Sequence, residues 1–242
     1  MVTWVVRALL SLCVMLAGCA LLRAPAAKEE VLFGGTLQEL VPHHHGDHFV
    51  YRVAGKHGNN PLQVEHLSQL DAAGEFILDL TVDGVPAGRQ HLRDDGTSVL
   101  LISEGWMQQG VIVSYDPPLP GLAVPLTTAT RRATAAVTMQ DGRNGKVVAR
   151  GRVEQTSTAS RPAGDDTGVF AVRTVRAIQL TNSATRLAAT TWIKPGIGEV
   201  RSDGVVDGGP RIRRELLCAI VDGTRMGDKC DQILSPAPEN PQ

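Results

Sequence analysis

The stretch from His43 to His48 contains four histidines and one aspartate, and their side chains could bind a metal ion. In an extended segment alternate residues share a face, so His43, His45 and Asp47 would lie on one side. His48 would lie on the other side. Imidazole and carboxylate groups are ligands of Zn²⁺ and Cu²⁺ in proteins. The distant residues that could complete such a site are His57, His66 and His91. The alternative, which we favour, is a polar turn before the first long strand, with its histidines in water.

A second reactive residue, Cys19, follows an N-terminal segment with the pattern of a secretory signal peptide. Residues 1–18 carry Arg7 near the start, then an apolar stretch too short to span a bilayer, then two small residues. The tetrapeptide Leu-Ala-Gly-Cys that ends at Cys19 resembles the lipobox of bacterial lipoproteins. This resemblance implies cleavage before Cys19 and attachment of acyl chains such as palmitate to its thiol. The alternatives are Cys13, which follows a bulky leucine, and cleavage near Ala27 without a lipid.

The same resemblance implies a location and a division of the chain. By the sorting rule of Gram-negative lipoproteins, Ala20 after the lipidated cysteine implies the outer membrane, with the protein facing the periplasm. Anchoring in the inner membrane and exposure at the cell surface stay open. We expect residues 1–18 to be the signal peptide, 19–40 the lipidated N-terminus and tether, 41–234 a β domain and 235–242 a disordered tail.

Cys218 and Cys230 are the cysteines that remain once Cys13 is removed and Cys19 is acylated. An exported chain meets an oxidising compartment, so we expect them to form a disulfide. Closing so short a loop contributes roughly 2 to 3 kcal/mol to the free energy of unfolding. A redox-active pair would have the short Cys-x-x-Cys spacing, which is absent, and two buried free thiols are the remaining alternative.

The sequence has no nucleophile elbow, no glycine-rich phosphate loop and no His-Glu-x-x-His zinc helix. We therefore expect a protein that is not an enzyme and has no cofactor. A net charge of −1 argues against a nucleic-acid partner. The densest basic run, Arg211 to Arg214, is interpreted as a solvated strand face rather than an anion site. The carboxylates of Glu75, Asp79 and Asp83 are likewise interpreted as a solvated strand face.

Alternating apolar and polar residues dominate the chain after His48 and predict strands rather than helices. Residues 75–83 are the clearest example, with Phe76, Leu78 and Leu80 expected to face a core. The predicted strands are 48–54, 62–70, 75–83, 86–93, 97–104, 110–115, 134–139, 146–157, 168–182, 186–193 and 210–221. Turn dipeptides such as Asp83-Gly84 separate them. The pattern predicts an all-β fold with few helices, in which an antiparallel sheet forms a sandwich or curls into a partly closed barrel. The proline-rich run 116–120 is expected to be a crossing loop.

Four short motifs resemble a group of uncharacterised bacterial lipoproteins whose sheet is similar to the half-barrels of lipoprotein carriers and lipid-binding lipoproteins. They are Pro42 with the following Gly46–Tyr51, the proline-rich run, Arg161–Gly164 with Phe170 and Val172, and Trp192–Val200. The histidine run and Ile193 depart from the pattern. Such carriers hold acyl chains on a concave face, so the resemblance implies lipid binding.

These features lead to three hypotheses about function. The first is a non-enzymatic lipoprotein, anchored in a membrane through Cys19, that binds a lipid or another envelope protein. The second is a metal-binding module that uses the segment His43–His48. The third is a structural or adhesion role, which would need a filled core instead of an internal groove.

Overall fold

The computed structural model describes residues 29–54, 60–69, 74–164, 167–207, 209–227 and 229–234. The internal contacts of the chain separate residues 1–30 from the unit that starts at Val31, and the fold described here is that of this second unit. Its helices are α2 (Leu37–Leu40) and α3 (Cys230–Leu234). Its strands are β1 (Val31–Phe33), β2 (His48–Ala54), β3 (Leu62–Gln69), β4 (Glu75–Val82), β5 (Val85–Asp94), β6 (Ser98–Trp106), β7 (Val111–Ala123), β8 (Leu126–Thr127), β9 (Arg131–Asp141), β10 (Val147–Ser160), β11 (Phe170–Leu180), β12 (Ser183–Lys194), β13 (Gly198–Val206), β14 (Arg211–Val221) and β15 (Thr224–Met226).

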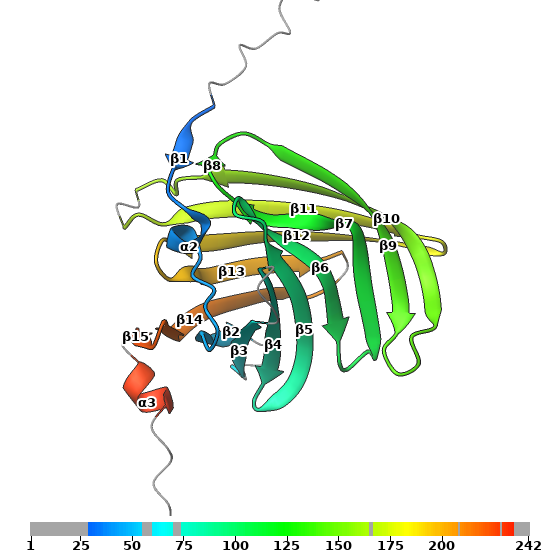
Figure 1. The fold of residues 1–242 in the computed structure, drawn as a ribbon, viewed down its shortest axis with the longest axis horizontal. Helices are drawn as coiled ribbons and strands as arrows, with labels where there is room; N and C mark the ends of the chain where they lie inside the picture. Colours follow the sequence, from blue (N-terminus) through cyan, green and yellow to red (C-terminus); the bar gives the residue numbers. More distant parts are fainter. Residues whose placement is uncertain are drawn as a thin grey trace, which may run out of the picture. The chain divides into compact units, whose positions relative to one another are not determined.

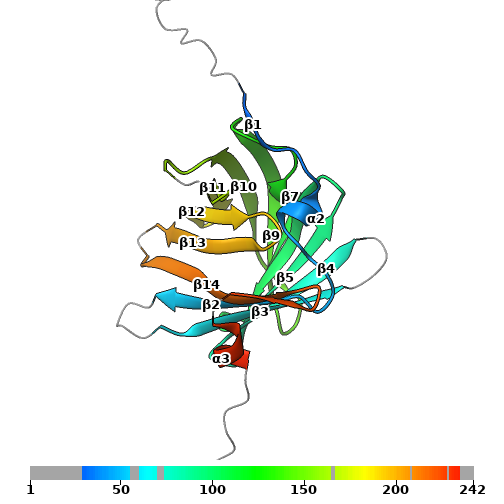
Figure 2. The same cartoon turned by 90° about the vertical axis from the view of Figure 1, so that its left-hand side faces the viewer.

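The strands form a closed antiparallel barrel (Figures 1 and 2). The order in the sheet is β13-β12-β11-β10-β9-β7-β6-β5-β4-β3-β2-β14-β15, and the additional pairing of β13 with β14 closes a ring of 12 strands. β15 extends from β14 outside the ring, and β1 pairs with β8 in a separate two-stranded sheet. The predicted all-β class with few helices is confirmed, and the closure selects the barrel over the sandwich.

Tight turns join neighbouring strands because their residues tolerate a left-handed backbone. Asp83 and Gly84 have φ values of 48° and 79°, and Asp222 and Gly223 have 47° and 72°. Two consecutive residues with positive φ form the turn whose twist matches that of the strands on either side. These dipeptides therefore place β4 beside β5 and β14 beside β15, as the sequence predicts for turns of this kind.

The proline-rich run lies inside β7, so the prediction of a crossing loop is wrong. β7 pairs with β9 only as far as Asp116, opposite Ala136, because the prolines that follow have no N–H to donate. On its other edge β7 continues to pair with β6: Ser114 lies opposite Ser103, and Leu119 lies opposite Leu101. The register shifts between these two pairs. The run is thus a bulge: β7 remains paired with β6, while its pairing with β9 ends.

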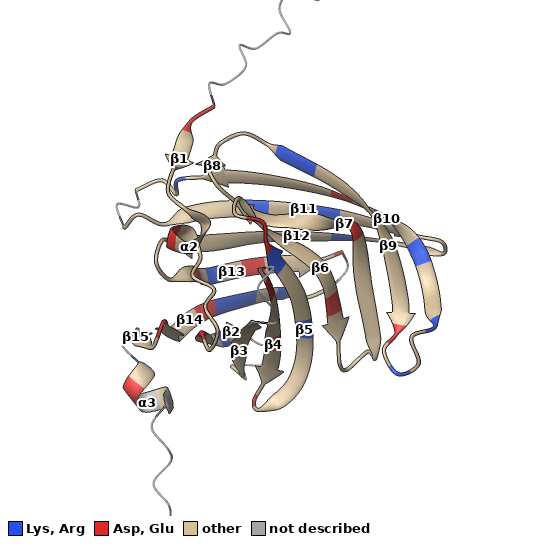
Figure 3. Cartoon of the chain, in the orientation of Figure 1, with Lys and Arg blue, Asp and Glu red and all other residues tan. Residues whose placement is uncertain are grey.

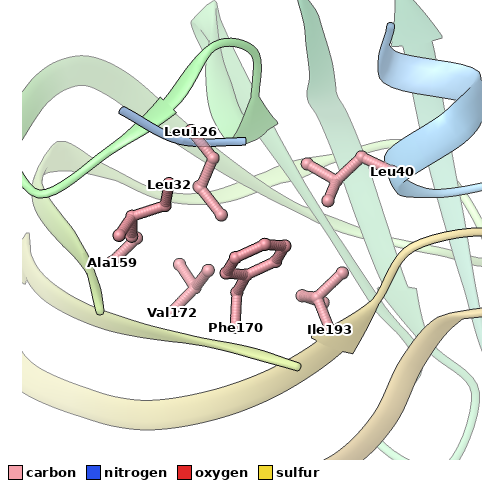
Figure 4. Close-up of a cluster of buried hydrophobic side chains, with 7 residues drawn as sticks. All are labelled: Leu32, Leu40, Leu126, Ala159, Phe170, Val172 and Ile193. Atoms are coloured by element: carbon pink, nitrogen blue, oxygen red, sulfur yellow. The ribbon is translucent and has the colours of Figure 1, made fainter. Parts of the chain in front are cut away.

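Residues 31–40 belong to the barrel unit and not to a tether, contrary to the expected boundary. Thr36 and Glu39 form a capping box that starts α2, with the Glu39 N–H donating to Thr36 Oγ1 and the Thr36 N–H donating to the Glu39 carboxylate. Leu40 and Leu32 are 0% and 5% exposed, and both belong to a buried cluster that includes Phe170 from β11. Figure 4 shows Leu32, Leu40 and Leu126 pointing toward Phe170, Val172 and Ile193. The predicted signal peptide, Cys19 and the tail 235–242 lie outside the described residues.

β13 is not among the strands predicted from alternation, and its pairing with β14 closes the barrel. It follows a turn in which Gly196 and Gly198 have φ values of 79° and 92°. Its partner β12 carries Trp192, whose ring lies 4.5 Å from the Arg201 guanidinium of β13. This cation–π contact covers part of the Trp192 ring.

Candidate functional site

The histidine segment does not assemble a metal site. His43 is turned inward, with Nδ1 2.8 Å from the Val41 carbonyl oxygen and Nε2 2.9 Å from the Asp94 carboxylate. Both of its ring nitrogens are therefore used in hydrogen bonds, and its ring stacks on Phe76. Asp47 is 1% exposed and accepts from the backbone N–H groups of His44 and Asp222.

The other candidate histidines of the metal-binding hypothesis form no metal-holding group with His43 and Asp47 in the described part of the chain. His45 is exposed on the turn, and His48 lies beside His66 with ring centroids 5.8 Å apart. His91 contacts Glu75 at 2.8 Å, and His57 lies outside the described residues. Among the residues that the structure describes, no group of three or more His, Cys, Asp or Glu side chains could hold a metal ion.

The predicted disulfide is confirmed: Cys218 of β14 and Cys230 of α3 are joined, with an S–S distance of 2.06 Å. Both residues are buried in a cluster with Val50, against which Leu62 and Ile233 also pack. The disulfide joins α3 to β14, and such a cross-link stabilises the folded state.

The candidate site is a cavity of about 300 Å³ inside the barrel. Its apolar lining includes Phe49, Leu67, Phe76, Leu92, Val172 and Ile193. Its polar lining includes Tyr51, Glu65, Gln155, Arg176, Glu199 and Arg214. The cavity therefore combines a wall that favours hydrocarbon with side chains that can bind a charged or hydrogen-bonding group.

β11 shows how the two kinds of lining are separated along the barrel. Alternate residues of a strand share a face, and Phe170 and Val172 lie in the buried cluster next to α2. The next residues on this face, Thr174 and Arg176, line the cavity. Ile178, one step further, packs on a second apolar cluster. A polar layer thus lies between two apolar layers inside the barrel.

One part of this polar layer is an ion-paired group centred on Arg214. Its Nε and Nη2 lie 2.6 and 2.8 Å from the two carboxylate oxygens of Glu199, and its Nη1 donates to Glu65. The guanidinium also lies 4.7 Å from the Tyr51 ring centroid. Burial raises the pKa of Glu65 above its usual value, with Arg214 opposing this shift and Glu199 adding to it. Arg214 therefore has both carboxylates as fixed partners.

The interpretation of the basic run as a solvated strand face is wrong for Arg214. Arg211 and Arg213 are exposed and both donate to Asp203, at 2.5 and 3.4 Å from Nε. Arg214 has the opposite orientation, because adjacent residues of β14 point to opposite faces of the sheet. Figure 3 shows acidic and basic segments side by side on β13 and β14, where these pairs form.

A second part of the polar layer is centred on Arg176. Its Nε donates to Gln155 Oε1 at 2.7 Å, and Gln155 Nε2 donates to the Pro120 carbonyl oxygen at 2.5 Å. Glu104 lies 4.0 Å from Arg176 Nη1 and accepts a hydrogen bond from the Tyr115 hydroxyl at 2.5 Å. Burial, and then Glu104, raise the pKa of Tyr115 well above its usual value. Tyr115 is thus a stable donor that holds Glu104 in place.

Sequence reasoning singled out neither Arg176 nor Glu65 as a site residue. A usable signal exists for Arg176: on β11 it has the same parity as Phe170, Val172 and Ile178, which are the apolar, inward positions. A charged residue at an inward position is costly unless it is paired or functional. Glu65 gives no such signal, because Leu62 and Val64 on the other face of β3 are also apolar and pack beside α3.

Comparisons with known proteins add two distant structural likenesses. No protein family model matches the chain, and no curated protein matches it. Of the solved structures, a Bacteroides fragilis protein described as exported and as having a YmcC-like fold is 12% identical, with a TM-score of 0.39 over 77% of this chain and 98% of that chain. A protein from Parabacteroides distasonis described as a lipoprotein is 12% identical, with a TM-score of 0.36 over 77% of this chain and 97% of that chain.

At these identities and TM-scores, neither likeness carries an argument about what this chain binds or where it is located. The resemblance to a lipoprotein family therefore stays a prediction from the sequence. Within the described part of the chain, no helix combines the length and apolar character that crossing a membrane would require.

Proposed function

We propose that this chain is a non-enzymatic lipoprotein of the cell envelope, anchored through Cys19, whose barrel binds a lipid in its interior cavity. The observation that carries the proposal is the cavity of about 300 Å³ with an apolar wall. Cavities for small ligands have volumes of about 300 to 1,000 Å³ and are mostly apolar. A structural or adhesion role needs only a filled core, and a partner protein would bind on the outside of the barrel. The cavity therefore favours a lipid ligand over these alternatives.

Lipid uptake by the mature chain carrying Cys19→Ser tests the ligand part of the proposal. We expect native mass spectrometry to show one bound lipid, and titration with a fluorescent fatty acid to saturate at one equivalent. Thr191 lines the cavity, so Thr191→Phe should reduce uptake by filling it. Arg173 lies on the exposed face of β11, so Arg173→Phe is the matched control and should not change uptake. Absence of both bound lipid and uptake in the unsubstituted barrel contradicts the proposal.

Labelling in cells tests the anchoring part separately. The lipobox-like tetrapeptide before Cys19 supports acylation at this thiol, and two or more acyl chains give stable membrane attachment. We expect labelled palmitate to be incorporated into the wild-type protein and the protein to fractionate with the outer membrane. Cys19→Ser should abolish both, whereas Cys13→Ser should change neither. Unlabelled wild-type protein would show that the chain is not a lipoprotein.

A further inference from the structure

We infer that the ligand of the cavity is an amphipathic anion, whose carboxylate or phosphate group binds to Arg176 and whose hydrocarbon chain lies against the apolar wall. This inference rests on the proposed function and adds the chemical class of the ligand. It depends on a difference between the two arginines that line the cavity, Arg176 and Arg214.

Arg214 has little capacity left for a ligand. Three of its nitrogens donate to Glu65 and Glu199, and Nε also lies 2.9 Å from Ser202 Oγ. Both carboxylates already pair with the guanidinium, so a ligand anion would have to compete with them. We therefore assign Arg214 a structural role.

Arg176 is the cation with donors to spare. In the described part of the chain, its one hydrogen bond runs from Nε to Gln155, and the carboxylate of Glu104 is 4.0 Å from Nη1, beyond hydrogen-bond distance. Its side chain is 22% exposed while lining the cavity. The N–H groups of Nη1 and Nη2 form a planar fork, which matches two oxygens of a carboxylate or phosphate.

The orientation of this fork is fixed before a ligand binds. Gln155 is 3% exposed and is held by the Pro120 carbonyl oxygen, so its Oε1 holds Arg176 Nε at 2.7 Å. Glu104 is held in turn by Tyr115. Gln155 is thus a positioning residue, because it acts on the ligand through Arg176.

The neighbours of Arg176 along β11 set the direction of the hydrocarbon chain. Thr174 and Val172 lead from Arg176 toward the cluster beside α2, and Val172 and Ile193 line the cavity there. The volume of about 300 Å³ is twice that of the roughly 150 Å³ apolar cavity that takes up benzene. The cavity therefore accommodates about a dozen non-hydrogen atoms, the size of decanoate.

Isothermal titration of the mature Cys19→Ser chain with three probes of equal chain length tests the inference: decanoate, decyl phosphate and decanol. We expect decanoate or decyl phosphate to bind at least about tenfold more tightly than decanol, since a hydrogen bond to a charged group contributes about 1.5 to 3 kcal/mol. The tighter of the two anions identifies a fatty acid or a phospholipid as the source of the head group. Arg176→Met should weaken anion binding by about tenfold or more and leave decanol unchanged. Arg173→Met removes an arginine from the outer face of the same strand and should leave the binding of all three probes unchanged.

Each outcome separates this inference from the proposed function. Equal binding of decanol and the two anions, or no effect of Arg176→Met, overturns the anionic head group but leaves lipid binding intact. Binding of none of the probes overturns both. If Arg176→Met does not fold, Arg176→Lys keeps the charge but loses the fork. It should then bind the anions several-fold more weakly, and unchanged binding would overturn the role of Arg176.

Discussion

At the scale of single residues, the interior of this barrel is held together by charges that would be costly if they were unpaired. Glu65 is 6% exposed and Glu199 lies beside it, so two carboxylates share one region of low dielectric. Arg214 bonds to both, and this geometry offsets the cost of removing the charges from water. Removal of Arg214 should therefore lower the free energy of unfolding more than the loss of one surface ion pair does.

Arg214→Met is expected to lower the free energy of unfolding by about 3 to 5 kcal/mol, because it leaves two buried carboxylates without their cation. Urea unfolding followed by circular dichroism measures this change. Arg213→Met is the matched control: Arg213 is exposed and its contact with Asp203 is 3.4 Å, so about 0 to 1 kcal/mol is expected. Adding Glu65→Gln to Arg214→Met should restore part of the lost free energy of unfolding, because it removes one of the two carboxylates left without a cation. Equal effects of the two arginine substitutions would show that the interior pairs do not stabilise the barrel.

His48 should make the stability depend on pH. Burial, and then the neighbouring His66, lower the pKa of His48 below its usual value of 6.5. The unfolded chain therefore binds more protons than the folded chain between the folded pKa and 6.5, and stability falls as the pH falls through this range. Well above pH 6.5 the imidazole is neutral in both states and this contribution is constant.

Thermal unfolding of wild type and His48→Gln between pH 8 and pH 5 tests whether stability falls with pH as predicted. The difference in Tm between the two proteins should be constant well above pH 6.5. At lower pH the Tm of the wild type should fall relative to that of the variant. His66→Gln should reduce the pH dependence only in part, because it leaves the burial of His48 in place. A difference that does not change with pH would exclude His48 as the titrating group.

At the scale of the elements, close approach of strands constrains individual positions. Gly151 of β10 lies opposite Leu180 of β11, and a Cβ at Gly151 would lie 2.9 Å from the Leu180 Cα and nearer still to the Gln179 carbonyl oxygen. These atoms belong to the backbone and cannot move without shifting β11. At Gly204 the nearest atom is Ala189 Cβ at 3.5 Å, an ordinary contact.

Gly151→Ala should therefore destabilise the barrel by about 1 to 3 kcal/mol, the usual cost of forcing extra volume into a packed region. Gly204→Ala, in a strand of the same barrel, should be neutral or stabilise it by about 0.4 to 1 kcal/mol, because it reduces the freedom of the unfolded chain. The difference between the two urea midpoints is the measurement. A neutral Gly151→Ala would mean that β10 and β11 lie further apart than the structure has them.

Most elements of the barrel could be predicted from alternation and turns, and the exceptions have physical reasons. β4 is predictable because apolar residues occupy every second position and Asp83-Gly84 ends it. β13 was missed because Gly198, Ser202 and Gly204 interrupt the apolar positions of a strand whose inward face borders charged groups. β7 was cut short because a sequence does not show that a strand can lose one neighbour at its prolines and keep the other.

The candidate site was less predictable than the fold. Alternation gives the two faces of a strand but not which face is inside when the interior contains a polar layer. Arg214 therefore looked like its neighbours Arg211 and Arg213, which are exposed. The disulfide could be predicted, since it needed only the number of remaining cysteines and the compartment, whereas the cavity depends on the closure of β13 on β14.

At the scale of the whole molecule, the segment before β2 completes the core at one end of the barrel. β1 and α2 contribute Leu32, Leu37 and Leu40, which are 5%, 2% and 0% exposed. Val41 and Pro42, which follow α2, line the cavity. The segment that leads from the expected lipid anchor is thus also part of the wall around the expected ligand.

Two truncations of the mature chain test where the barrel unit begins. A chain that starts at Glu29 retains β1 and α2. Its free energy of unfolding in urea should equal that of the Cys19→Ser chain within about 0.5 kcal/mol. A chain that starts at Val41 lacks three buried leucines, each of which stabilises the fold by about 1.5 to 3 kcal/mol when buried, so it should be destabilised by several kcal/mol. Leu40→Ala should reproduce part of this loss, about 2 to 5 kcal/mol, while Val31→Ala should not, because Val31 is 57% exposed. If both truncated chains unfold at the same urea concentration, residues 31–40 are a tether after all, and the wall of the cavity beside α2 is not fixed by them.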